Sequence, residues 1–242
     1  MAIMETLKLG TKQLGLQLNH RQLEHFRTYF EELVTWNKRV NLTAITNFEE
    51  VQIKHFLDSL TVTLALKPSA GDKGLSVIDV GSGAGLPGIP LKILFREMRL
   101  VLLEATAKKA AFLEHRKRQL GLDDIEIVVG RAEEVAHQVQ YREQFDVVLS
   151  RAVASLPTLA ELTLPFCAIG GSFIAQKKGD ITLEISQASR AISLLGGSMR
   201  EVKRVDLTEF GDERWLVIID KISPTPPQYP RRPGMPNKRP IV

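Results

Sequence analysis

Residues 76–90 read SVIDVGSGAGLPGIP, and no other segment says more about the architecture of this chain. The apolar run from Leu75 to Val80 predicts a buried strand, and it leads into glycines at positions 81, 83 and 85 ahead of a helical segment. Alternate glycines permit the positive φ angles of a tight strand-to-helix turn and keep β-carbons away from an approaching ligand. The pattern predicts a cofactor-binding turn, with an ordinary glycine-rich turn as the plainer alternative.

The spacing of these glycines narrows the class of ligand. A dinucleotide-binding turn follows G-x-G-x-x-G, which from Gly81 and Gly83 requires a glycine at position 86. The chain has Leu86 there. This residue disfavours a nucleotide-dependent oxidoreductase, which we keep only as a distant alternative.

The pattern after Leu75 alternates between apolar runs and helical segments. Five strand–helix units extend to Leu195, and two further strand segments, REVKRV and RWLVIID, follow without a helix between them. The alternation predicts an α/β fold with a doubly wound, mostly parallel sheet, in which the last hairpin makes one pair antiparallel.

The first seventy residues predict helices. Asn19 and Asn47 each begin the spacing of a capping box, and apolar residues follow at helical intervals. We expect a helical extension over 1–70 that packs on the core, an α/β domain over 71–221 and a tail over 222–242.

One histidine in this extension stands near a carboxylate. His55 and Asp58 lie three residues apart on one face of the second expected helix, which could face a ligand. We expect a structural histidine–carboxylate pair as their use.

Composition excludes several classes of protein. Apolar residues make up 44% and charged residues 25%, which is ordinary for a globular protein. The chain has no long apolar window and no signal-peptide pattern at its start, so we expect a cytoplasmic protein without a membrane partner. The single cysteine, Cys167, excludes an internal disulfide and a cysteine-based zinc cluster, and we expect it in the core and no bound metal.

The net charge of +4 resides in the tail. The tail contains no acidic residue and holds four cations, Arg231, Arg232, Lys238 and Arg239, together with seven of the twelve prolines. We expect it to run extended rather than helical. A stiff basic segment suits an RNA phosphate backbone, so these four cations are candidate RNA-binding residues, with a solvated tail as the alternative.

Strand ends supply further candidates, because ligands of open α/β sheets bind beyond the carboxyl ends of the strands. Glu104 ends the second strand, where its carboxylate could accept hydrogen bonds from ribose hydroxyls; the alternative is a role at the start of the next helix. Ala132 and Glu133 follow the third strand and could bind the edge of an adenine; the alternative is a helix cap. Arg151 ends the fourth strand, where we expect it to lie next to the group that would be transferred.

The segment from Asp79 to Gly85 resembles the first motif of class I S-adenosylmethionine-dependent methyltransferases, an acidic residue followed by three alternate glycines. More specifically, the chain resembles the ribosomal RNA small-subunit methyltransferase G family (RsmG, also called GidB). The matching segments are WNKRVNLTAIT at 36–46, HFLDSL at 55–60, DVGSGAGLPGIPLKI at 79–93, VGRAEE at 129–134, SRAVASLPTL at 150–159 and YPRRPGMPNKRP at 229–240.

The resemblance implies a Rossmann-like class I methyltransferase fold with seven strands and an N-terminal helical extension. It implies that S-adenosylmethionine is the methyl donor and that guanine N7 in the 530 loop of bacterial 16S ribosomal RNA is the acceptor, presented by that RNA or by the small ribosomal subunit. With Gly83 of the glycine turn, the implied cofactor contacts are Gly81, Leu86, Glu104, Ala105, Thr106, Ala132, Glu133 and Arg151. QKKGD at 176–180 is only loosely similar to the corresponding family segment, so Lys177 and Lys178 receive no role.

The implied acceptor explains the lack of an obvious base. Guanine N7 carries a lone pair and no proton, so catalysis should come from alignment of the reactants, with Arg151 as a positioning candidate for cofactor or RNA. Two alternatives stay open: a methyltransferase for a small molecule, and a non-catalytic RNA-binding or assembly factor on the same scaffold. The oligomeric state also stays open.

Overall fold

The computed structural model describes residues 4–67 and 74–242. Seven strands form one sheet in the order β3-β2-β1-β4-β5-β7-β6. The strands are β1 (Ser76–Val80), β2 (Arg99–Glu104), β3 (Ile125–Val129), β4 (Phe145–Arg151), β5 (Cys167–Lys178), β6 (Gly197–Arg204) and β7 (Arg214–Lys221). The predicted mostly parallel, seven-stranded sheet is confirmed. The expectation of one antiparallel pair is wrong, because β7 runs antiparallel to both β5 and β6.

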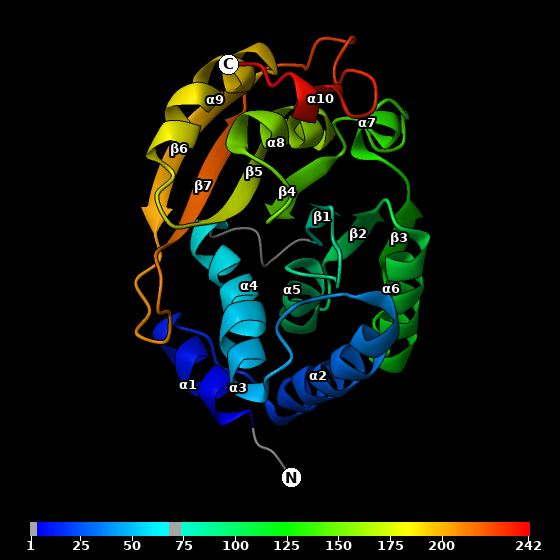
Figure 1. Ribbon diagram of the computed structural model, residues 1–242, viewed down its shortest axis with the longest axis vertical. Coiled ribbons are helices and arrows are strands. Elements are labelled where there is room, and N and C mark those ends of the chain that lie inside the picture. Colours follow the sequence, from blue (N-terminus) through cyan, green and yellow to red (C-terminus); the bar gives the residue numbers. More distant parts are fainter. Residues whose placement is uncertain (1–3, 68–73) are drawn as a thin grey trace.

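Helices cover both faces of the sheet (Figure 1). One face carries α1 (Glu5–Gln13), α2 (His20–Val40), α3 (Phe48–Val51), a π-helical segment η1 (Gln52–Leu57), α4 (Asp58–Leu60), a 3-10 turn η2 (Thr61–Ala65), α5 (Gly88–Leu94) and α6 (Ala107–Gln119). The other carries α7 (Ala132–Val135), α8 (Leu156–Thr163), a 3-10 turn η4 (Leu164–Phe166), α9 (Thr182–Leu194) and α10 (Met235–Lys238).

Each face of the sheet has its own hydrophobic core. Side chains alternate between the faces along a strand, so Val77 packs with the N-terminal helices while Ile78 packs with α8 and α9. Cys167 is fully buried in the second core, as predicted for a small apolar residue.

The N-terminal helices support the glycine turn through a hydrogen bond. The predicted capping box of Asn19 and Gln22 is present at the start of α2, and the Asn47 side chain accepts hydrogen bonds at the start of α3. Farther along α2, the buried Tyr29 hydroxyl donates to the Ala84 carbonyl inside the turn. The helix after Asn47 also exists, but it widens to a π-helix over Gln52–Leu57, a geometry often found at functional sites.

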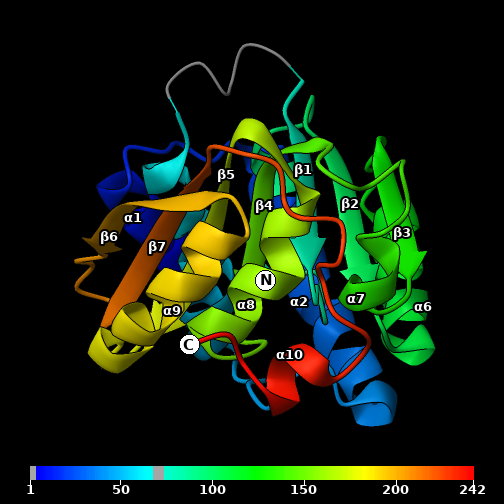
Figure 2. The same ribbon diagram turned by 90° about the horizontal axis from the view of Figure 1, so that it is seen from above.

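The tail lies on the protein surface beside α8, includes α10 and ends next to α9, where Arg190 donates to the Val242 carbonyl (Figure 2). The expectation of a wholly extended tail is wrong over Met235–Lys238, where the chain forms a short helix. Pro236 is tolerated there because the first helical turn has N–H groups without intrahelical partners anyway.

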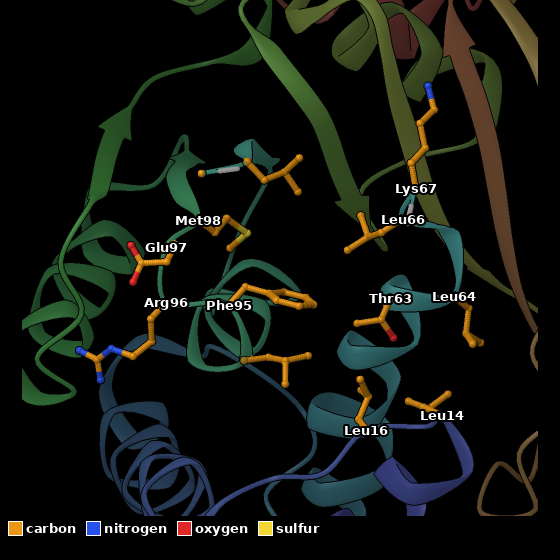
Figure 3. A pocket seen from close by; sticks show the side chains of 13 residues that line it. Leu14, Leu16, Thr63, Leu64, Leu66, Lys67, Phe95, Arg96, Glu97 and Met98 are labelled. Carbon is orange, nitrogen blue, oxygen red and sulfur yellow. The ribbon is translucent and has the colours of Figure 1, made fainter. Parts of the chain in front are cut away.

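A cavity of about 500 Å³ opens at the amino ends of β1 and β2, lined by apolar side chains such as Leu14, Leu16 and Phe95 (Figure 3). Ligands of open α/β sheets bind at the opposite, carboxyl ends of the strands, so this cavity is not the candidate site. Within the described parts of the chain, no helix is long and apolar enough to cross a lipid bilayer.

Candidate functional site

The glycine turn after β1 is fixed by backbone hydrogen bonds to β2. Gly81 and Ser82 both donate their N–H groups to the Leu103 carbonyl, at 2.9 and 3.1 Å. Gly81, Gly83 and Gly85 have φ angles of +75°, +58° and +88°, which side chains rarely permit. A β-carbon on Gly81 would lie 2.7 Å from a Val153 methyl group and one on Gly85 would lie closer still to an Ile89 methyl group, whereas one on Gly83 would meet only the Gly81 carbonyl oxygen at 3.9 Å. The turn therefore needs glycine for its backbone shape and, at Gly81 and Gly85, for room.

Asp79 places a buried carboxylate beneath this turn. Its Oδ2 accepts the Gly88 N–H at 2.9 Å, while its Oδ1 makes no hydrogen bond of ordinary geometry among the described residues, although the nearby Ser82 hydroxyl favours the charged carboxylate. Burial raises the pKa of Asp79 to about 6. A buried oxygen with free lone pairs suits a ligand donor such as an ammonium group. Asp79 belongs to the predicted motif but was not among the predicted contacts, although a lone carboxylate in an apolar strand was a visible signal.

Glu104 ties the end of β2 to the glycine turn. Its Oε2 accepts the Gly83 N–H at 2.9 Å, and its Oε1 accepts the Thr106 N–H at 2.8 Å, just before α6. The helix-start role considered from the sequence is therefore real. Each carboxylate oxygen can still accept a further hydrogen bond, so a ligand role is compatible with it.

A cavity of about 200 Å³ lies at the carboxyl ends of β1, β2 and β3, and we call it the glycine-turn cavity. Four predicted contacts line it: Gly81, Ala105, Ala132 and Glu133. The other predicted contacts, Gly83, Leu86, Glu104, Thr106 and Arg151, are not part of its lining. Gly234, Pro236 and Asn237 also line it, and no pattern in the sequence predicted this contribution from the tail.

A second cavity, of about 550 Å³, lies at the carboxyl ends of β4 and β5, and we call it the basic cavity. Five cationic side chains line it: Lys54, Arg151, Lys177, Lys178 and Arg214. Three carboxylates, Asp58, Glu184 and Asp212, line it as well, and each pairs with one or two of these cations. The cations still outnumber the carboxylates in the lining, and this excess suits a phosphate-bearing ligand.

Asp58 organises the arginines of the basic cavity. Its Oδ2 lies 2.8 Å from Arg151 Nη1 and its Oδ1 lies 3.3 Å from Arg214 Nε. All three side chains are largely buried, so this network is held more firmly than an exposed ion pair. It joins the N-terminal helices to the end of β4 and the start of β7.

His55 does not pair with Asp58, so that expectation is wrong. His55 Nε2 lies 2.7 Å from the Thr43 hydroxyl, and no hydrogen bond or ion pair joins it to Asp58 in the described chain. Burial, reinforced by the charge of Arg151, lowers the pKa of His55 to about 4. The imidazole is therefore neutral at pH 7.

The tail cations divide into two groups. Arg231 is engaged, because its guanidinium binds the Glu161 carboxylate through Nε at 2.9 Å and Nη2 at 2.6 Å. Arg232, Lys238 and Arg239 are exposed. In the described part of the chain, no group of His, Cys, Asp and Glu has the arrangement of a metal site.

Solved structures share the fold. An O-methyltransferase from Bacillus cereus in complex with SAH has a TM-score of 0.56 at 19% identity, covering 80% of this chain and 91% of that one. A mutant of MtNAS in complex with S-adenosylmethionine has a TM-score of 0.54 at 15% identity, covering 82% of this chain and 75% of that one. The sheet and its flanking helices are those of a class I methyltransferase, as predicted.

Sequence relatives cover the whole chain. The ribosomal RNA small subunit methyltransferase G of Dehalococcoides mccartyi (strain BAV1) is 53% identical over 239 residues, covering 99% of this chain and 100% of its own length. The protein of the same name from Roseiflexus castenholzii is 49% identical over 238 residues, covering 98% of this chain and 99% of its own length. The GidB family model, described as rRNA small subunit methyltransferase G, matches residues 22–211. On these grounds the chain belongs to the ribosomal RNA small subunit methyltransferase G family.

Proposed function

We propose that the chain transfers the methyl group of S-adenosylmethionine to guanine N7 in the 530 loop of 16S ribosomal RNA. The observation that carries the proposal is the placement of two unlike cavities on either side of one loop. The loop after β4 contributes Ala152 to the basic cavity, and Val153 and Ala154 to the glycine-turn cavity. A donor and an acceptor bound in the two cavities would therefore meet at the end of β4.

The residues in and beside the glycine-turn cavity fit S-adenosylmethionine. Next to the cavity lining, the buried Asp79 carboxylate offers an oxygen for the amino group of the ligand, and Glu104 offers acceptor capacity for ribose hydroxyls. Gly81 allows close approach, while Ala132 and Glu133 would hold the adenine edge. When bound, this cofactor supplies a methyl group on a positively charged sulfur, which makes the methyl carbon electrophilic.

The residues of the basic cavity fit an acceptor that needs no general base. Guanine N7 has a lone pair and loses no proton on methylation. Accordingly, neutral His55 hydrogen-bonds to Thr43, and Asp58 is occupied by two arginines. Arg151 would position the acceptor, and alignment of reactants lowers barriers by roughly 7–11 kcal/mol in well-oriented reactions.

The exposed cations of the tail would extend the contact with RNA. Arg232, Lys238 and Arg239 are available to phosphates, whereas Arg231 is occupied by Glu161. N7 lies on the major-groove edge, which is deep and narrow in paired RNA, so a loop or a splayed base is a suitable target. Because such a substrate is found in the cytoplasm, we expect the protein to act there.

Methyl transfer from labelled S-adenosylmethionine tests this proposal. The acceptors are 16S ribosomal RNA and intact small subunits that lack the modification, and chemical strand cleavage then maps 7-methylguanine. One labelled guanine in the 530 loop supports the proposal, and the form of RNA that is labelled identifies the substrate. Cofactor binding without label would favour the non-catalytic assembly factor, and label on another nucleotide would replace the proposed acceptor.

A further inference from the structure

The tail supplies part of the wall of the glycine-turn cavity. Gly234, Pro236 and Asn237 line it together with residues that follow β1, β2 and β3. In Figure 1 the short helix α10, which contains two of them, lies beside α8 and close to α7. This segment lies beyond residues 22–211, which the family model matches.

A hydrogen bond couples this wall to a predicted cofactor contact. The Gly234 N–H donates to Glu133 Oε1 at 2.9 Å. Gly234 has a φ of +81°, a conformation that glycine adopts without strain. This hydrogen bond orients the Glu133 carboxylate through one oxygen. The other oxygen is not involved in it and can accept a hydrogen bond from a ligand.

An ion pair holds the wall in place. Glu161 lies on α8 with its side chain 1% exposed, and within the described residues every hydrogen bond it accepts comes from Arg231. Arg231 also donates to the Arg239 carbonyl at 2.8 Å, and the Thr158 hydroxyl donates to the Pro236 carbonyl at 3.2 Å. Because an unpaired buried charge would cost free energy, a carboxylate with a single partner keeps that partner in place.

We infer that Gly234, Pro236 and Asn237 are part of the cofactor site, and that the ion pair of Arg231 with Glu161 positions this wall against Glu133. Arg231 thus serves cofactor affinity and not RNA binding. The inference rests on the proposed function in that the glycine-turn cavity takes the adenosine part of S-adenosylmethionine. Because a preordered wall lowers the cost of binding, loosening it should weaken cofactor affinity by at least about tenfold, or about 1.4 kcal/mol.

Two matched pairs of variants of the full chain test the inference by calorimetric titration with S-adenosylmethionine and S-adenosylhomocysteine. Arg231→Met should raise the dissociation constants at least about tenfold, while Arg232→Met, which removes the same charge from an exposed side chain, should leave them unchanged. Equal dissociation constants for the two variants would overturn the inference.

The second pair covers the case in which Arg231→Met does not fold, as judged by thermal melting. Asn237→Trp fills the cavity from an exposed position, and Lys238→Trp places the same ring one residue outside the lining. Only Asn237→Trp should weaken cofactor binding, and equal affinity in the two would overturn the inference. An unaltered protein that binds neither cofactor would instead overturn the proposed function, and this inference with it.

Discussion

Asp58, at the end of the π-helical segment, holds Arg151, at the end of β4, with Nη1 and Oδ2 2.8 Å apart. This contact joins the N-terminal helices to the loop that separates the two cavities. Asp58 also lies 3.3 Å from Arg214, so one carboxylate sets the position of two cations in the basic cavity. The N-terminal helices therefore contribute to the site as well as to the core.

The first prediction concerns this carboxylate. Asp58→Asn keeps the shape of the side chain but removes the charge that holds Arg151, so methyl transfer should fall roughly tenfold to a hundredfold, with cofactor affinity nearly unchanged. Asp212→Asn is the control, because exposed Asp212 also pairs with Arg214. Single-turnover rates with saturating RNA give the measurement. An unchanged rate in a folded Asp58→Asn protein would remove Arg151 from its positioning role.

The second prediction concerns Gly83, whose φ is +58° and where an added β-carbon would meet only the Gly81 carbonyl oxygen, at an ordinary contact distance of 3.9 Å. Gly83→Val should cost about 1–2 kcal/mol of stability through backbone strain and should obstruct cofactor binding. Gly121→Val is the matched control, because its φ is +53°, an added β-carbon would meet nothing within 4 Å, and it lies outside the glycine turn. Calorimetry should find weakened affinity only for Gly83→Val. Equal affinity for both would contradict the assignment of the glycine turn.

The third prediction concerns pH. Burial raises the pKa of Asp79 from 3.8 to about 6, so the folded protein binds the proton more tightly than the unfolded chain does. The contribution of Asp79 to stability is therefore fully present below pH 3.8 and is lost as pH rises to about 6, by at most about 3 kcal/mol. Denaturant unfolding of the unaltered protein and of Asp79→Asn across this range measures the difference. A constant difference would show that the carboxyl group is not perturbed.

Protonation of Asp79 should also affect cofactor affinity, and it should weaken binding where it stabilises the fold. Below about pH 6 the carboxyl group becomes neutral and attracts an ammonium group less, so affinity for S-adenosylmethionine should fall there. Asp79→Asn should bind more weakly and lose this pH dependence. A pH profile shared by both proteins would assign the titration to another group.

The fourth prediction concerns the three exposed tail cations. Replacing Arg232, Lys238 and Arg239 with glutamine should weaken RNA binding and flatten its salt dependence, by about one unit of slope for each phosphate that is no longer neutralised. Exposed Lys12, Arg21 and Lys38, on α1 and α2, replaced in the same way, provide a control with the same loss of net charge. If the salt slope stays the same, the tail cations are solvated and bind no phosphate.

The sequence predicts the sheet and the glycine turn because their signals are local. The apolar runs, the alternate glycines and the carboxylate that ends β2 all follow from neighbouring residues. Partners that lie far apart in the chain leave no such signal, and Arg231 with Glu161 is one example. His55 shows how local spacing misleads, because a residue twelve positions away, Thr43, is its partner.

The wall formed by Gly234, Pro236 and Asn237 has a consequence for biosynthesis. In chain order this wall is made after all seven strands. A nascent chain on the ribosome can therefore assemble the complete sheet and the glycine turn while the glycine-turn cavity still lacks one side. A chain that terminates early, after β7, would lack this wall and would leave the buried Glu161 without Arg231, so we expect tight cofactor binding only from the full-length chain.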